Sequence, residues 1–343
     1  MQLPVSYRMI FFLFFAVRAS VCTAQCIVPV EAYREASMHV LKGDYIGAEK
    51  AMDSFIGEHP DEPAGPLLKA AVLQYACTDY ENFSREEEFL SLLDEAVKLA
   101  GGKSDEGEDD LWALYYMAAA DGLRGVWSVT SGSLLRGIIR GRSGAKGMER
   151  IVEADSTFFD AYLMLGSYRF WRNVALRRIS WLPFIEAEIN GGLDDARLAI
   201  KRGRLTGPLS NTVLLEMLLD QDPGEAVSCG ERLIADFPGC RLFAWQLGEA
   251  YKKLGRYDDA VSVFTGIAES MEKDEGDDGS GELRCWWKLA VLSKTVGNTD
   301  ECVFYCRKVI TLGERPAVRE RQRKRIETAG KWLDEMTGDD IDQ

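Results

Sequence analysis

Apolar residues recur at intervals of three and four along most of this chain, which is the spacing that places them on one face of an α-helix. The segment RLFAWQLGEAYKKLGRYDDAVSVFTGI, residues 241–267, shows this pattern twice, once on each side of Gly255. A glycine that directly follows a periodic segment commonly ends a helix. The pattern therefore predicts two amphipathic helices that pack against each other as an antiparallel pair.

The same pattern returns along the chain with a regular frame. Segments that begin at residues 29, 159, 207 and 283 place small and apolar residues at the positions that they occupy in the 241 segment, and two less regular helix pairs fill the gap between 63 and 158. A final periodic segment has charges on its outer side, which is typical of a helix that caps a stack. We expect helix pairs near 29–62, 63–110, 111–158, 159–206, 207–240, 241–282 and 283–316, followed by a capping helix at 316–336.

This frame resembles the tetratricopeptide repeat (TPR), whose pattern is matched in the 241 segment by Leu247, Gly248, Tyr251, Gly255, Tyr257, Ala260 and Phe264. The resemblance implies an all-α fold, a TPR-like α-solenoid of about seven antiparallel helix pairs with a C-terminal capping helix over residues 25–343. It also implies a role in protein–protein interaction, with partners held in a groove that is lined by the first helices of the pairs. The repeat residues are structural and nominate no site.

A weaker likeness connects two segments to the eukaryotic TPR family that is linked to inclusion-body clearance and lipid droplets. It is carried by DGLRGVWSVTSGSLLRGIIRGRSGAKG, residues 121–147, and by ALRRISWLPF followed by GGLDDA. We expect an exported, bacterial chain, which departs from that eukaryotic setting. We therefore do not transfer that family's role to this chain.

The N-terminus is typical of a secretory signal peptide. Arg8 precedes a short apolar run from Met9 to Val17, and small residues follow it. We expect cleavage after Ala24, so that residues 1–24 are removed and the protein is exported to the periplasm or the cell envelope. A lipoprotein is an alternative that we do not favour, because the residues before Cys22 and Cys26 fit a lipid-attachment signal poorly.

Cleavage there leaves seven of the eight cysteines, so at least one has no partner for a disulfide. An oxidising compartment favours disulfides, and Cys26 with Cys77 is one pairing that would staple the N-terminal part. Cys285, Cys302 and Cys306 have a spacing that invites a metal interpretation, but no fourth ligand is suitably spaced. Small buried cysteines in helix packing are the better interpretation, so we expect no metal site.

Composition argues against two classes of function. The chain has 41 Lys and Arg against 55 Asp and Glu, a formal net charge of -14, so it lacks the extended basic surface that nucleic-acid binding requires. It contains only two histidines, His39 and His59, and neither neighbours a convincing nucleophile. No HExxH, GxSxG or GxGxxG motif is present. We expect a protein without catalytic residues and without a cofactor.

Two basic segments interrupt this acidic chain. Residues 122–147 and 167–185 together contain nine Lys or Arg and no Asp or Glu. We expect each segment to include an insert between the two helices of its pair, and stacking of consecutive pairs would make them neighbours. The candidate ligand or partner surface comprises the tryptophans and most of the cations of these segments: Trp127, Arg136, Arg140, Arg142, Lys146, Arg169, Trp171, Arg172, Arg177, Arg178 and Trp181.

Three interpretations of this surface remain open. The arginines could pair with the protein's own acidic surface, the segments could accept an anionic lipid or small ligand with the tryptophans as interfacial aromatics, or they could dock one protein partner. The function that the whole sequence predicts is an exported, non-catalytic TPR scaffold with unidentified protein partners. The alternative is a binder of lipid or another anionic ligand through the two basic segments.

Overall fold

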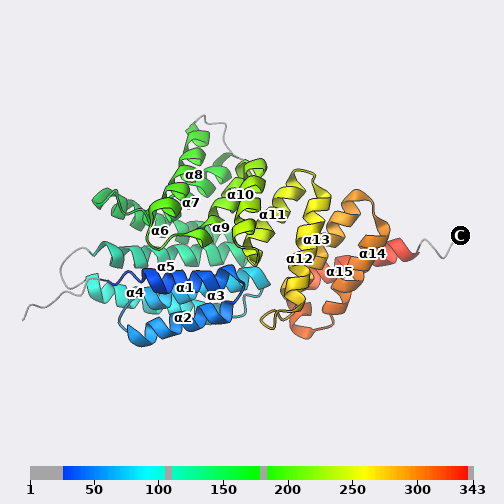
Figure 1. Cartoon of the computed structure of the whole chain (residues 1–343), viewed down its shortest axis with the longest axis horizontal. Coiled ribbons are helices and arrows are strands. Elements are labelled where there is room, and N and C mark those ends of the chain that lie inside the picture. Colours follow the sequence, from blue (N-terminus) through cyan, green and yellow to red (C-terminus); the bar gives the residue numbers. More distant parts are fainter. Residues whose placement is uncertain (1–25, 105–109, 178–183, 339–343) are drawn as a thin grey trace, which may run out of the picture.

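The computed structural model describes residues 26–104, 110–177 and 184–338. Within these ranges the chain forms fifteen α-helices, one 3-10 turn and no strand (Figure 1). In chain order the helices are α1 (Val30–Leu41), α2 (Tyr45–Glu58), α3 (Ala64–Tyr80), α4 (Glu86–Ser104), α5 (Leu111–Thr130), α6 (Leu134–Ala154), α7 (Ala161–Arg177), α8 (Phe184–Arg202), α9 (Asn211–Gln221), α10 (Pro223–Asp236), α11 (Arg241–Lys253), α12 (Tyr257–Glu272), α13 (Ser280–Val296), α14 (Thr299–Leu312) and α15 (Pro316–Gly338). The 3-10 turn η1 (Pro208–Ser210) precedes α9.

Each odd-numbered helix from α1 to α13 packs against the even-numbered helix that follows it, and α15 packs on α14. Polar side chains fix where several second helices begin. Each of these accepts a hydrogen bond from a backbone N–H three residues on: Asp44 before α2, Asp222 before α10 and Asn298 before α14. The all-α fold of about seven helix pairs with a final capping helix is confirmed.

The stack bends back on itself. One hydrophobic cluster joins Val40 and Leu41 of α1 and Tyr45 of α2 to Phe243 and Leu247 of α11, which lie about two hundred residues later in the chain. A second cluster fills the space between α3, α4, α5 and α6. Helix α3 contributes side chains to both clusters and also contacts α13. The early pairs, α1 to α4, therefore lie directly against the late pairs, α11 to α14.

The expected inserts between helices are not present in the first basic segment. Its extra residues lengthen the two helices, so that α5 has 20 residues and α6 has 21, against 13 in α11. Only residues 131–133 connect α5 to α6. In the second basic segment, residues 167–177 belong to α7, and residues 178–183 lie outside the described residues. An apolar face that continues without a break favours a longer helix over a loop, because a helix satisfies its own backbone hydrogen bonds.

Glycines bring α5 and α6 unusually close together. A Cβ at Gly144 would lie 2.7 Å from the backbone oxygen of Ala118, and one at Gly125 would lie 3.0 Å from the backbone nitrogen of Gly141. In α7 and α8, a Cβ at Gly166 would lie 2.6 Å from the backbone oxygen of Gly192. The glycines of the basic segments are therefore explained by backbone contact between paired helices.

We predict that Gly144→Ala destabilises the protein by about 1–3 kcal/mol, because the new methyl group meets backbone that cannot move aside. The matched control is Gly266→Ala in α12, where a Cβ meets nothing within 4 Å. This control should be neutral or stabilising by up to about 1 kcal/mol, since alanine is the better helix former. Urea unfolding of both variants measures the difference, and equal effects at the two positions would contradict the close-packing explanation.

Candidate functional site

A buried ion pair joins the early helices to the late ones. The Asp79 carboxylate near the end of α3 is fully buried and accepts hydrogen bonds from Arg241 Nε at 2.8 Å, Trp245 Nε1 at 2.9 Å and the Tyr45 hydroxyl at 2.9 Å. These three donors come from α2 and α11. Burial raises the pKa of the Tyr45 hydroxyl well above its usual value, and the Asp79 charge adds to this effect, so Tyr45 stays a donor.

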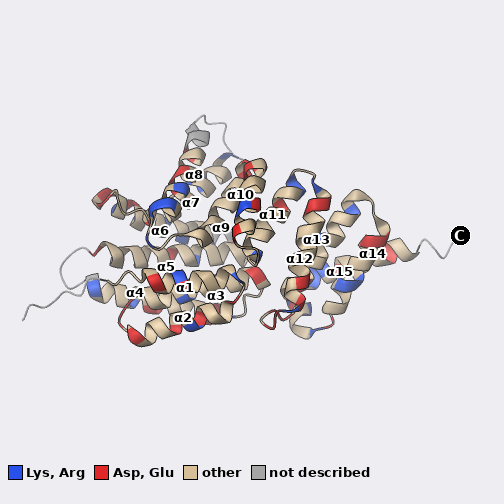
Figure 2. Ribbon diagram, in the orientation of Figure 1, with Lys and Arg blue, Asp and Glu red and all other residues tan. Residues whose placement is uncertain are grey.

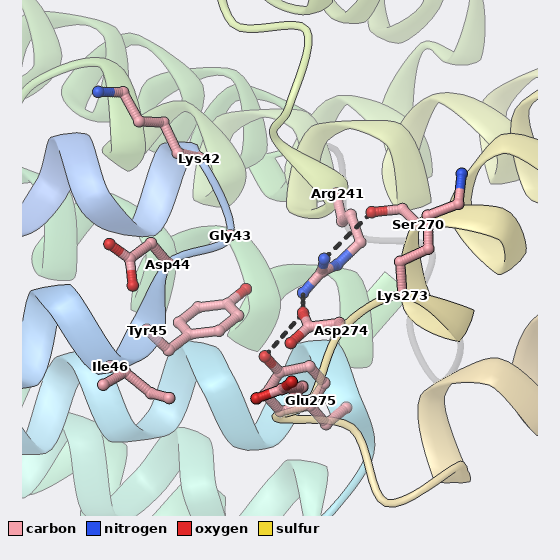
Figure 3. A pocket seen from close by; sticks show the side chains of 11 residues that line it. Lys42, Gly43, Asp44, Tyr45, Ile46, Arg241, Ser270, Lys273, Asp274 and Glu275 are labelled. Carbon is pink, nitrogen blue, oxygen red and sulfur yellow. Dashed lines mark hydrogen bonds and ion pairs between the residues drawn. The ribbon is translucent and has the colours of Figure 1, made fainter.

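The Arg241 guanidinium has two further partners. Besides Asp79, it donates to Asp274 Oδ2 at 2.7 Å and to Ser270 Oγ at 3.2 Å (Figure 3). Burial disfavours its charge, but the neighbouring carboxylates outweigh burial and raise the pKa of Arg241 above its ordinary value. Gly43, which has a φ of +75°, leaves room for this group, because a Cβ there would lie 3.2 Å from Arg241 Nη1.

A polar pocket of about 300 Å³ opens beside this pair (Figure 3). Asp274 forms part of its wall and also accepts a hydrogen bond from the Tyr80 hydroxyl at 2.9 Å. The charges on its wall balance, since Lys42, Arg241 and Lys273 face Asp44, Asp274 and Glu275. Each of the three guanidinium nitrogens of Arg241 donates to a protein atom, and the pocket lies at the seam between the early and the late helices.

The C-terminal helix α15 also contacts the end of α3. We call this contact, together with the Asp79–Arg241 pair, the closure. Glu81 directly follows α3, has a left-handed φ of 51°, and is held by Arg325 and by Gln322 Nε2, which donates at 3.0 Å. Burial opposes its charge, yet Arg325, Arg284 and Gln322 prevail and lower the pKa of Glu81. Helix α15 therefore does more than cover the last pair, since it also holds the end of α3.

Trp127 is not a surface residue, so its selection as an interfacial aromatic is wrong. Its side chain is 1% exposed and stacks on Phe89 of α4 at a centroid distance of 4.2 Å, with the edge of Phe83 at 5.2 Å. The face of α5 that carries Trp127 packs against α4 and fills the second hydrophobic cluster. Trp171 on α7, in contrast, is 38% exposed.

Of the cations of the first basic segment, Arg124 of α5 pairs with Asp94 and Asp121, and the other four lie on α6. Arg136 donates to Ser133 Oγ at 2.6 Å and Arg140 to Ser128 Oγ at 3.3 Å, while Arg142 and Lys146 are exposed. None of these four has an acidic partner among the residues that the structure describes. Figure 2 shows how Lys and Arg are distributed over the ribbon relative to the Asp and Glu of the other helices.

The arginines of the second basic segment are paired with acidic residues. Arg169 contacts Asp195 at 3.0 Å, Arg172 contacts Glu188 at 3.7 Å and Arg177 contacts Asp220 at 2.9 Å. Arg178 and Trp181 lie outside the described residues. The two segments do meet, because the Tyr168 ring of α7 lies over Gly141 of α6. The described arginines of α7 pair with the protein's own carboxylates, whereas the four cations of the first segment that lie on α6 have no acidic partner among the described residues.

The pairing of Cys26 with Cys77 is not formed. Both are buried free thiols, as are the other described cysteines. Cys26 lies beside Asp110 at the start of α5, whereas Cys77 lies in α3 near Arg85, Glu49 and Glu88. Burial raises the pKa of each thiol to about 12, so both behave as small apolar side chains.

Within the described parts of the chain, no helix is long and apolar enough to cross a membrane. The same residues contain no group of three or more His, Cys, Asp or Glu side chains that could hold a metal ion.

Residues 243–267, in α11 and α12, match the family model of the tetratricopeptide repeat. The chain contains a TPR. Among solved structures, a TPR protein from Parabacteroides merdae is 11% identical with a TM-score of 0.40, over 89% of this chain and 97% of that chain. The C-terminal part of a TPR protein from Cytophaga hutchinsonii is 12% identical with a TM-score of 0.44, over 88% of this chain and 99% of that chain. No curated protein matches the chain.

Sequence reasoning missed the residues of the closure. Asp79, Arg241 and Trp245 lie in different repeats, and nothing in their local pattern connects them. One signal was available: in the 241 segment, the first TPR position is a charged Arg241 at the start of an apolar helix, and a charge there needs a partner.

We predict that Arg241→Met costs about 3–5 kcal/mol of stability, because it leaves the Asp79 carboxylate buried without a counter-charge. The control is Arg323→Met, which breaks an exposed pair with Glu327 and should cost less than about 1 kcal/mol. Denaturant unfolding measures both. Combining Arg241→Met with Asp79→Asn should cost less than the sum of the single changes, and simple additivity would contradict the pairing.

Proposed function

We propose that this protein is an exported, non-catalytic scaffold that binds other proteins. The TPR at residues 243–267 supports the interaction role, since such repeats present stacked helix faces to partners. The signal-like sequence before Ala24 supports export. The described side chains support a role without chemistry, because the strongest polar cluster, around Asp79 and Arg241, is internally satisfied.

In this proposal, protein partners do not bind to the part of the inner groove where α3 lies against α11 and α13. α3, α11 and α13 are each the first helix of a pair, and the end of α3 lies against both α11 and α13: Arg241 meets Asp79, and Arg284 donates to the Thr78 carbonyl oxygen at 3.2 Å. The chain itself fills the inner face at this point. Protein partners are therefore expected on the outer faces of the helix pairs and on the remaining inner surface.

The second candidate function is binding of an anionic ligand through the basic segments. The observation that favours it is the absence of acidic partners around Arg136, Arg140, Arg142 and Lys146 among the described residues. Because the described arginines of α7 are paired with acidic residues, we assign this anion binding to the cations of α6.

The scaffold role is tested by affinity capture from the native cell envelope with the tagged mature chain. We expect a small set of proteins at near-stoichiometric amounts that excess untagged chain displaces, because a specific surface saturates. The control is the same chain with Arg241→Met, which opens the closed stack and should change or abolish the captured set. A set that untagged chain does not displace would contradict the proposal.

Export is tested by expressing the full chain in a bacterium and fractionating the cells. We expect a mature protein in the periplasm or envelope whose N-terminus, measured by mass spectrometry, is Gln25. A matched variant that replaces the apolar residues Phe14 and Phe15 with Asp should stay in the cytoplasm uncleaved, since charge in the apolar run blocks recognition of the signal. An uncleaved wild-type chain in the cytoplasm would refute export.

A further inference from the structure

The outer face of α6 carries exposed cations that have no acidic partner among the described residues. Ile139, Arg142, Lys146 and Arg150 follow one another at intervals of three and four, so they lie on one side of the helix. All four are exposed, and Ile139 is 62% exposed. The opposite side of α6 carries Gly137, Gly141, Gly144 and Met148 and packs against α5 and α7.

Apolar side chains gather beside these cations at the end of the α5–α6 hairpin. Ile138 is 45% exposed, and Val126 and Val129 of α5 are 49% and 46% exposed. Val129 of α5 lies against Gly137 of α6, directly before Ile138, whereas Ile139 lies on the outer side of α6 with the cations. Exposing several large apolar residues in one place is unfavourable in water and commonly marks a surface that meets something apolar.

The neighbouring helix extends this surface. Tyr168 of α7 lies over Gly141 of α6, and the two helices run in opposite directions. One turn further along each helix are Ile138 and Trp171, so the exposed Trp171 lies at the same end as the exposed isoleucines. Aromatic rings with a polar edge are favoured where water meets the apolar part of a bilayer.

We propose that this α6 face attaches the protein reversibly to an anionic lipid surface. The face is defined by Ile138, Ile139, Arg142 and Lys146 of α6. The exposed cations of α6 would attract anionic headgroups, and the exposed isoleucines near its start would enter the apolar part of the bilayer. This attachment rests on the second candidate function, the binding of an anionic ligand through α6, and it names a lipid surface as that ligand.

Charge complementarity favours an anionic surface as the occupant, and the rest of the chain orients the contact. The chain has a formal net charge of -14, so most of its surface is repelled by anionic lipid. The acid-free stretch from Gly122 to Met148 offers attraction, because its cations on α6 have no acidic partner among the described residues, and Glu149 and Glu153 follow it at the far end of α6. The hairpin end therefore faces the lipid, while the acidic helix pairs face away.

The experiment is co-sedimentation of the purified mature chain with vesicles of phosphatidylcholine alone or of phosphatidylcholine with phosphatidylglycerol. We expect binding only to the anionic vesicles, weakening as salt is added. Arg142→Glu with Lys146→Glu should reduce the affinity by at least about thirtyfold, since each cation near such a surface contributes about fivefold. Ile138→Ser with Ile139→Ser should remove the part of the binding that survives high salt.

The matched control is Arg323→Glu with Lys324→Glu on α15, at the other end of the molecule in Figure 1. It changes the net charge by the same amount on exposed residues outside the α6 face and should leave vesicle binding almost unchanged. Circular dichroism and thermal unfolding establish that all variants are folded, which the exposure of the changed side chains favours.

Three results would overturn the proposal. The first is equal binding to neutral and anionic vesicles, and the second is equal weakening by the α6 and α15 variants. The third is an absence of vesicle binding combined with binding to polyglutamate that the α6 variant abolishes, which would identify an acidic protein as the occupant. Vesicle binding uses purified chain and lipid alone, so its outcome is independent of the envelope capture that tests the scaffold role.

Discussion

The buried pair between Asp79 and Arg241 is the interaction on which the shape of this molecule depends. A stack of helix pairs that contact only their neighbours is open at both ends and needs no long-range contact. Here a fully buried carboxylate on the second pair is neutralised by an arginine on the sixth, and Tyr45 and Trp245 complete its hydrogen bonds. A buried charge without such partners would cost several kcal/mol, so the closed arrangement is strongly specified.

In the two long helix pairs, α5–α6 and α7–α8, the close glycine contacts between the helices determine which side chains face outward. Glycine at 125, 141 and 144 lets the backbones of α5 and α6 meet, which turns the larger side chains of α6 outward. An arginine-rich helix can then pack tightly on one side and remain open on the other. In α7 the same packing around Gly166 is combined with arginines that contact acidic residues of α8 and α9.

Sequence periodicity was sufficient for the fold, because the helix-pair pattern is local. The frame around Leu247, Gly248 and Ala260 predicts the observed packing of α11 on α12. It was insufficient for the site. The acid-free stretch was visible, but whether Trp127 faces solvent depends on Phe89 of another pair, and whether Arg177 is paired depends on Asp220. The closure could not be predicted, since no short-range pattern records a contact between residues 79 and 241.

The closure also imposes an order on folding. Most repeat arrays can fold from either end as the chain is made, because each unit needs only the next one. In this chain Asp79 pairs with Arg241, 162 positions later, and Glu81 pairs with Arg325, 244 positions later. Neither pair can form before the later residue has been synthesised. Joining such distant segments costs loop entropy and slows folding. The early pairs therefore remain incomplete until nearly the whole chain is available, so a partly synthesised chain stays loosely folded.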